Sequence, residues 1–180
     1  MGLLLTVSNL YVPQFLRKRK LEMLFKATAD AFQATAPSTA EMSFDDCLKL
    51  YAEFTREQAD NSIRQGKDLE VQPRLFHNAY RIGQQLKMDF KVDKAHLMRT
   101  GALIYKMLKI DFRGDPEGQI VIRDCFFSAY YSSQVCCLIS SLDEGLLVGL
   151  AGEGRLRFYQ RITEGEACCR ACLETERRPE

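Results

Sequence analysis

The sequence predicts an α+β protein in which N-terminal helices pack on a mainly antiparallel sheet formed by the C-terminal half. Three observations carry this prediction. Apolar residues recur every three or four positions through the first 108 residues, and they recur every two positions in segments after residue 109. Turn-forming residues separate the alternating segments. Helices that precede antiparallel strands along the chain are typical of the α+β class.

Four amphipathic helices account for the first 108 residues. The first is expected over residues 13–36, and the second starts after Ser43, whose hydroxyl can cap it. Pro73 fits the first turn of the third helix, and Asp93 can cap the fourth. Each helix carries one apolar stripe, so each needs a partner surface on which to bury it.

Strands and one further helix follow. Residues 109–112 and 118–124 alternate in polarity around a turn rich in glycine and proline, which predicts a hairpin. A helical region is expected over 129–151. A second hairpin is expected from strands at 155–162 and 167–175, joined by a turn that contains glycine.

These elements are expected to form one domain over residues 1–180. The helical part, 1–108, and the strand–helix–hairpin part, 109–175, are not divided by any linker. The helices of the first part need the later strands to cover their apolar stripes.

Composition narrows the function classes. The chain has 25 Lys and Arg against 24 Asp and Glu, a formal net charge of +1, which argues against a nucleic-acid partner. The apolar opening is followed, not preceded, by basic residues, and no apolar stretch is expected to approach the ~20 residues of a membrane span. We therefore expect a cytoplasmic protein with no membrane partner, and leave a homodimer open.

Cysteine is distributed unevenly, with six of the seven after residue 124. Cys169 and Cys172 have the spacing of metal and redox sites, but one such pair is a weak signal. On a strand, residues three apart point to opposite faces, which separates the two sulfurs. We therefore predict no metal site and no cofactor, and keep a cysteine-based metal-binding domain as an alternative.

Cys125 and Asp143 are the strongest candidates for chemistry. Cys125 closes an alternating segment and precedes Ser128, a candidate cap for the next helix, so backbone N–H groups near the sulfur favour a thiolate. Packing against the neighbouring phenylalanines is the alternative. Asp143 can activate a water molecule, or it can belong to a helix turn. His77 and His96 fall on polar helix sides, so neither is expected to be a base.

The C-terminal third resembles the L-2-amino-thiazoline-4-carboxylic acid hydrolase family, whose related shape is the 4-vinyl reductase-like small-molecule-binding domain. Three features carry the resemblance: Cys125 with the aromatic residues after it, Asp143, and the segment 158–169 with its Thr, Gly-acidic turn and cysteines. The resemblance implies a hydrolase that adds water to the C=N carbon of a small cyclic amidine and opens the ring.

The resemblance also implies site residues. Cys125, Asp143 and Cys169 would be catalytic. The substrate would be held by Ser128, Tyr130, Tyr131, Cys137, Glu144, Arg161 and Thr163.

The residues themselves predict a closed pocket for a small organic molecule, between the helical region after Cys125 and the C-terminal hairpin. Hydroxyls and thiols concentrate there beside aromatic residues, a mixture typical of small-molecule sites. A binding or sensing domain without turnover is the main alternative to the hydrolase.

Overall fold

The computed structural model describes residues 14–175. Five α-helices, two short 3₁₀-helices and four strands follow one another along the chain in these residues. In order they are α2 (Gln14–Phe32), α3 (Phe44–Arg64), α4 (Asp68–Phe90), α5 (Leu97–Met107), β1 (Ile110–Gly114), β2 (Gln119–Cys125), η1 (Phe126–Ala129), α6 (Ser133–Ala151), β3 (Arg155–Gln160), η2 (Ile162–Glu164) and β4 (Cys169–Glu174).

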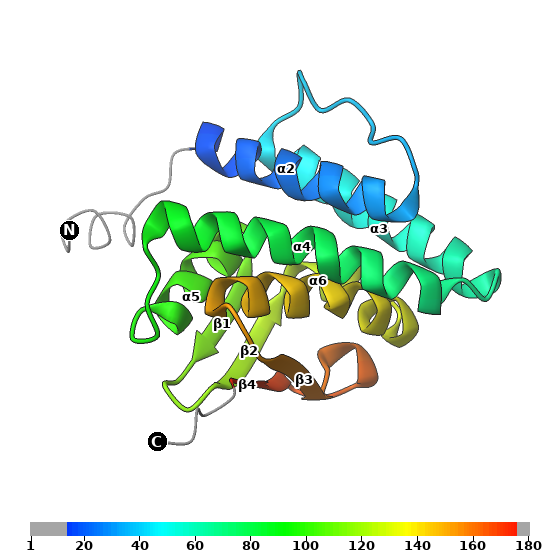
Figure 1. The fold of residues 1–180 in the computed structure, drawn as a ribbon. Coiled ribbons are helices and arrows are strands. Elements are labelled where there is room, and N and C mark those ends of the chain that lie inside the picture. Colours follow the sequence, from blue (N-terminus) through cyan, green and yellow to red (C-terminus); the bar gives the residue numbers. More distant parts are fainter. Residues whose placement is uncertain (1–13, 176–180) are drawn as a thin grey trace.

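The four strands form one antiparallel sheet in the order β1-β2-β4-β3. Both predicted hairpins are present, and β4 joins them by pairing with β2, so that Ile120 lies opposite Ala171. The helices lie on one side of this sheet (Figure 1). The predicted α+β class, with N-terminal helices and a C-terminal antiparallel sheet, is confirmed.

Some helix boundaries differ from those predicted. The first helix ends at Phe32, four residues early, and its expected start at residue 13 lies outside the described residues. The third begins at Asp68, so Pro73 is not in its first turn, and two acidic residues near its start favour the earlier beginning. Asp93 does not cap the fourth helix, which begins at Leu97, because its carboxylate accepts the His96 N–H of the preceding turn.

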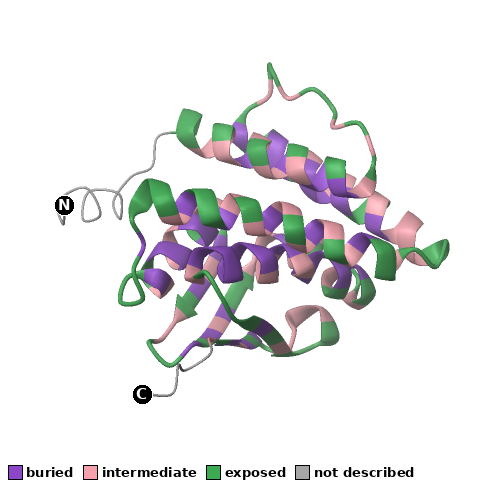
Figure 2. Ribbon diagram, in the orientation of Figure 1, coloured by how far each residue is buried: buried purple, intermediate pink, exposed green. Residues whose placement is uncertain are grey.

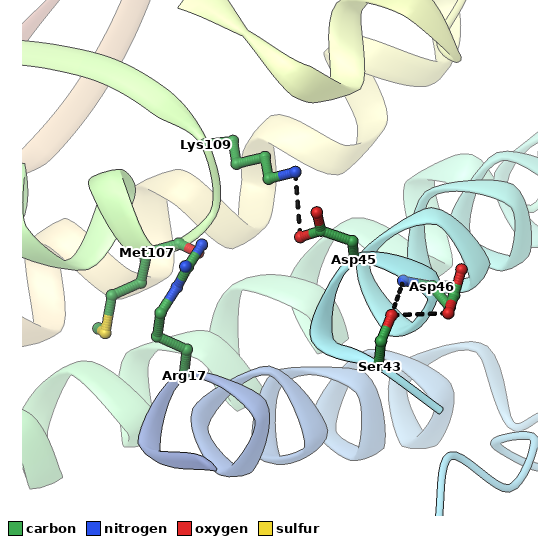
Figure 3. Close-up of polar contacts among 6 residues, drawn as sticks. All are labelled: Arg17, Ser43, Asp45, Asp46, Met107 and Lys109. Atoms are coloured by element: carbon green, nitrogen blue, oxygen red, sulfur yellow. Dashed lines mark hydrogen bonds and ion pairs between the residues drawn. The ribbon is translucent and has the colours of Figure 1, made fainter. Parts of the chain in front are cut away.

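Contacts near the start of α3 tie the N-terminal helices to the later part of the chain (Figure 3). Ser43 caps α3 as predicted, since its hydroxyl accepts the Asp46 N–H at 3.2 Å. Asp45 pairs with Lys109 at 3.0 Å, and Arg17 donates to the Met107 carbonyl at 3.3 Å. Both contacts reach the connection between α5 and β1.

Helix α6 lies in the core between α4 and the sheet (Figure 2). Its crossing with α4 brings two backbones into direct contact, because Gly145 and Gly149 face the carbonyl oxygens of Phe76 and Tyr80. Small residues four apart on a helix permit such an approach. Eleven of the 19 residues of α6 are buried, which explains its apolar character on all sides.

The length and composition of α6 correct one expectation. Within residues 14–175 it is the one helix that is long and apolar enough to meet the criteria for a membrane span. The prediction that no apolar stretch approaches that length is therefore wrong. Of the 18 residues that make up its most apolar stretch, 56% are buried inside the protein, as expected for a core helix.

Candidate functional site

A cavity of about 90 Å³ lies between α6, the C-terminal hairpin and the helices α3 and α5. It occupies the place predicted for a closed pocket and extends further, to the N-terminal helices. All of its lining residues are buried or half-buried. A cavity of roughly 150 Å³ in another protein core accepts benzene, so this one suits a ligand of few atoms.

Most of the cavity wall is apolar. Tyr51, Phe127 and Tyr131 form an aromatic group, with Tyr51 edge-on to Phe127 and Phe127 stacked on Tyr131. The hydroxyls of the two tyrosines are engaged away from the ring faces: Tyr51 bonds to Thr28 at 3.0 Å, and Tyr131 bonds to Thr55. The rings are thereby fixed as rigid walls.

Asp143 provides a carboxylate on one side of the cavity. Tyr105 donates a hydrogen bond to its Oδ1 at 2.8 Å. The residue is half-buried, and burial raises the pKa of the carboxyl from 3.8 to about 6, although Tyr105 and the more distant Arg161 act in the opposite direction. Asp143 therefore exchanges its proton close to neutral pH.

Arg161 provides a cation on the cavity wall. Its guanidinium lies 4.7 Å from the centre of the Phe158 ring and donates to the Ser140 hydroxyl at 3.4 Å. Its Nε is buried with no hydrogen-bond partner among the described residues. Arg161 is close enough to Asp143 to lower the pKa of that carboxyl, yet the two form no ion pair. A buried donor without a partner is costly, so Arg161 is suited to a ligand acceptor.

Three thiols face the same cavity: Cys125 from the end of β2, Cys136 from α6 and Cys169 from the start of β4. Cys169 accepts the Ile162 N–H at 3.4 Å. Thr163 lowers the pKa of Cys136, although the Thr163 hydroxyl makes no hydrogen bond of good geometry among residues 14–175. Burial outweighs these contacts and raises the pKa of all three thiols.

The expected thiolate at Cys125 is therefore wrong. As predicted, backbone N–H groups after the strand, those of Phe127 and Ser128, act on the sulfur and lower its pKa. Burial has the larger effect and raises the pKa to about 12. Ser128 is also not the cap of the next long helix: it donates to the Cys125 carbonyl at 2.7 Å, and Ser132 caps α6.

Thiol labelling measures this correction directly. Cys137 is the exposed cysteine, and we expect an alkylating agent at pH 7.5 to label it first, with Cys125 modified at least tenfold more slowly because the buried thiol is neutral. Peptide mass spectrometry of the folded protein gives the order. Modification of Cys125 ahead of Cys137 would show that its sulfur is neither buried nor protonated.

The cavity brings together seven of the ten residues predicted for the site. They are Cys125, Ser128, Tyr131, Asp143, Arg161, Thr163 and Cys169. Three do not line it: Tyr130 packs on Phe126, and Cys137 and Glu144 lie elsewhere on α6. Each of these two follows a lining residue by one position, which turns its side chain about 100° around the helix.

Sequence reasoning gave no catalytic or substrate-binding role to four polar residues of the cavity, although Cys136 was among the thiols that predict the pocket. Cys136 and Ser140 precede Asp143 by seven and three positions on α6, so helical spacing from Asp143 could have found them. Tyr51 and Tyr105 were predicted only as members of buried stripes. No local signal distinguishes a tyrosine that borders a cavity from one that fills the core.

Metal ligation has no support in the described part of the chain. Within residues 14–175, no group of three or more His, Cys, Asp or Glu side chains is arranged to hold a metal ion. Cys172 lies on the opposite side of β4 from Cys169, where its sulfur accepts from Gln119 at 3.3 Å. His77 and His96 are exposed, away from the cavity.

Fold and site together define an α+β protein with a small, partly open cavity that is lined by one carboxyl, one guanidinium and three neutral thiols. No protein-family model, curated protein or solved structure matches the chain. The resemblance of the C-terminal third to the thiazoline carboxylate hydrolases, the single domain and the cytoplasmic location stay predictions.

Proposed function

We infer that the protein binds a small zwitterionic or carboxylate-bearing organic molecule in this cavity. One observation carries the proposal: Asp143 and Arg161, both half-buried, line one mainly apolar cavity without pairing with each other. A buried carboxylate and a buried guanidinium that remain apart are costly unless other groups satisfy them. A ligand with a cationic and an anionic end satisfies both.

The lining favours a short, flat ligand. The volume of about 90 Å³ is less than the roughly 150 Å³ that accepts benzene, so a ring with a carboxylate requires the lining side chains to move apart, and the aromatic wall then supplies apolar contact. Ser140 lies three residues before Asp143 on α6, about 4.5 Å along the helix axis, and it contacts Arg161. The Arg161 guanidinium thus contacts α6 about one turn before Asp143 and is near enough to lower the pKa of that carboxyl.

Hydrolysis is the second candidate, and the pKa of Asp143 favours it. A carboxyl with a pKa of about 6 accepts a proton from water near neutral pH and can return it to a leaving ring atom. The hydroxide formed would attack the C=N carbon of a cyclic amidine whose carboxylate is held by Arg161. The ring C–S bond of the resulting tetrahedral carbon would then break, and the leaving sulfur would take the proton from Asp143. The three neutral thiols would be hydrogen-bond donors or packing groups, not nucleophiles.

Two measurements separate binding from turnover. A higher melting temperature of the protein reports ligand binding, and loss of the ligand's ring absorbance reports hydrolysis. The probe is 2-amino-thiazoline-4-carboxylate at pH 7, with its imidazoline analogue and simple aromatic acids. At 100 times the dissociation constant, binding adds about 2.7 kcal/mol to the free energy of unfolding. Turnover supports the hydrolase, and stabilisation alone supports the binding domain.

Substitutions of the two charged cavity residues test whether the ligand binds in the cavity. We expect Asp143→Asn and Arg161→Gln each to weaken binding by roughly 10-fold to 100-fold, the effect of losing a hydrogen bond to a charged group. Glu144→Gln is the matched control, because this carboxylate is adjacent in sequence but outside the cavity. Equal losses in Asp143→Asn and Glu144→Gln, or no stabilisation by any compound, would contradict the proposal.

A further inference from the structure

The face of the sheet that points away from α6, called here the outer face, is rich in arginine. Side chains alternate along a strand, and the outer positions hold Arg113 on β1, Arg123 on β2, Arg155 and Arg157 on β3, and Arg170 on β4. All five are exposed. In residues 14–175 no helix covers this face (Figure 1).

Two of these arginines already hold carboxylates. Arg113 lies 3.4 Å from Asp111, and Arg157 lies 3.5 Å from Glu174. Arg123, Arg155 and Arg170 make no side-chain hydrogen bond or ion pair with another described residue. With five arginines and two carboxylates, the face has a net charge of +3, although the whole chain has only +1. The positive charge is therefore concentrated here.

The strand register sets these cations in rows. Val121 lies opposite Arg113 on one side and Arg170 on the other, so that two guanidinium groups flank one apolar side chain. Arg155 and Arg157 are two residues apart on β3, which separates them by about 6.6 Å. Neighbouring strands lie about 4.8 Å apart. The face is thus an array of cations at the spacing of alternate side chains in an extended chain.

Tyr159 adds a large exposed aromatic side chain to the array, 59% exposed, at the irregular pairing between Phe158 and Gln160. Its hydroxyl donates to Gln119 at 3.1 Å, and Gln119 donates to Cys172 at 3.3 Å. These bonds link β3, β2 and β4 and hold the ring on the outer face. An ordered tyrosine loses little conformational entropy when a partner covers it.

We propose that the outer face is a docking surface for an acidic segment of a partner protein. Arginine and tyrosine are the residues that most often dominate binding energy at protein interfaces. The planar guanidinium matches a carboxylate with two parallel hydrogen bonds, as the pair of Arg113 with Asp111 illustrates. The single exposed aromatic and the modest net charge favour a protein over a nucleic acid, which uses several stacking rings and more cations.

Fluorescence anisotropy of the full chain with a labelled peptide of alternating glutamate and serine tests the proposal. In an extended peptide the glutamates recur about every 6.6–6.8 Å, the spacing of Arg155 and Arg157. We expect binding that weakens as salt rises and is absent for the glutamine–serine peptide. The triple variant Arg123→Glu, Arg155→Glu, Arg170→Glu should weaken binding at least tenfold.

The control has the same change in charge at exposed helical positions: Arg56→Glu, Arg81→Glu and Arg99→Glu. It should retain binding within about twofold, and circular dichroism should show both triple variants folded. Equal weakening in the two triple variants would overturn the proposal. Tighter binding of a single-stranded oligonucleotide of equal charge would also overturn it, as would dimerisation of the chain through this face in place of peptide binding.

Discussion

Asp143→Asn is expected to make the protein more stable at pH 7.5, although the change removes the central carboxylate of the cavity. Burial raises the pKa of Asp143 from 3.8 to about 6, so the folded protein holds its proton at pH values where the unfolded chain has already lost it. Ionisation in the cavity therefore costs free energy. Asparagine has no proton to lose, and its carbonyl can still accept from Tyr105.

The direction of the pH dependence follows from the raised pKa of Asp143 in the folded protein. Below about pH 4, Asp143 is protonated in both states and affects stability little. Between about pH 4 and 6 the unfolded chain binds fewer protons than the folded protein, so the free energy of unfolding falls as pH rises. The loss reaches about 3 kcal/mol above pH 6, since each unit of pKa shift corresponds to about 1.4 kcal/mol.

Urea unfolding at pH 4 and pH 7.5 measures this effect. The variant should match the wild type at pH 4 and exceed it by about 2–3 kcal/mol at pH 7.5, which raises the melting temperature by roughly 5–10 °C. Glu144→Gln, the matched control, should change stability by less than about 0.5 kcal/mol at either pH. A variant that is less stable than the wild type at pH 7.5 would show that the carboxylate is satisfied in the folded protein.

Gly145→Ala is expected to destabilise the fold by about 3 kcal/mol or more. A methyl group at this position would overlap the carbonyl oxygen of Phe76, and backbone cannot rotate away as a side chain can. The two helices must separate, which loosens the most extensive helix–helix contact of the fold. Alanine's better helix propensity offsets only about 1 kcal/mol.

Gly101→Ala is the matched control for this prediction. Gly101 is also buried in a helix, but a methyl group there would lie 3.4 Å from the Phe112 ring, an ordinary contact with a side chain. Its stability should change by no more than about 1 kcal/mol, with a gain expected from helix propensity. Equal melting temperatures for the Gly101 and Gly145 variants would mean that α4 and α6 do not meet along their backbones.

The fold class was predictable because two periodicities divide the chain. Spacing of three and four places Leu48 and Tyr51 on one helix face, and spacing of two places Ile120 and Ile122 on one sheet face. Helix starts were less predictable. A proline inside α4 and an aspartate before α5 both have the chemistry of a helix start. Acidic residues near Asp68 favour the earlier start of α4, and Asp93 accepts the His96 N–H of the turn before α5.

The site was predictable where its residues share one local element. Cys125, Ser128 and Tyr131 lie close together in sequence, as do Arg161 and Thr163, and all five line the cavity as predicted. The protonation of Cys125 was not predictable, since the backbone donors near the sulfur are a local feature and burial depends on the whole fold. Tyr105 reaches Asp143 only through tertiary packing, across 38 residues of sequence.

A crystal structure of the protein grown with 2-amino-thiazoline-4-carboxylate tests the central claim most directly. The account predicts ligand density inside the cavity, with the carboxylate within about 3 Å of Arg161 and the ring and amino nitrogens toward Asp143. Arg161 Nε, buried without a partner, would then be satisfied. A ligand bound elsewhere, or a direct ion pair between Arg161 and Asp143 that closes the cavity, would contradict the proposed binding site.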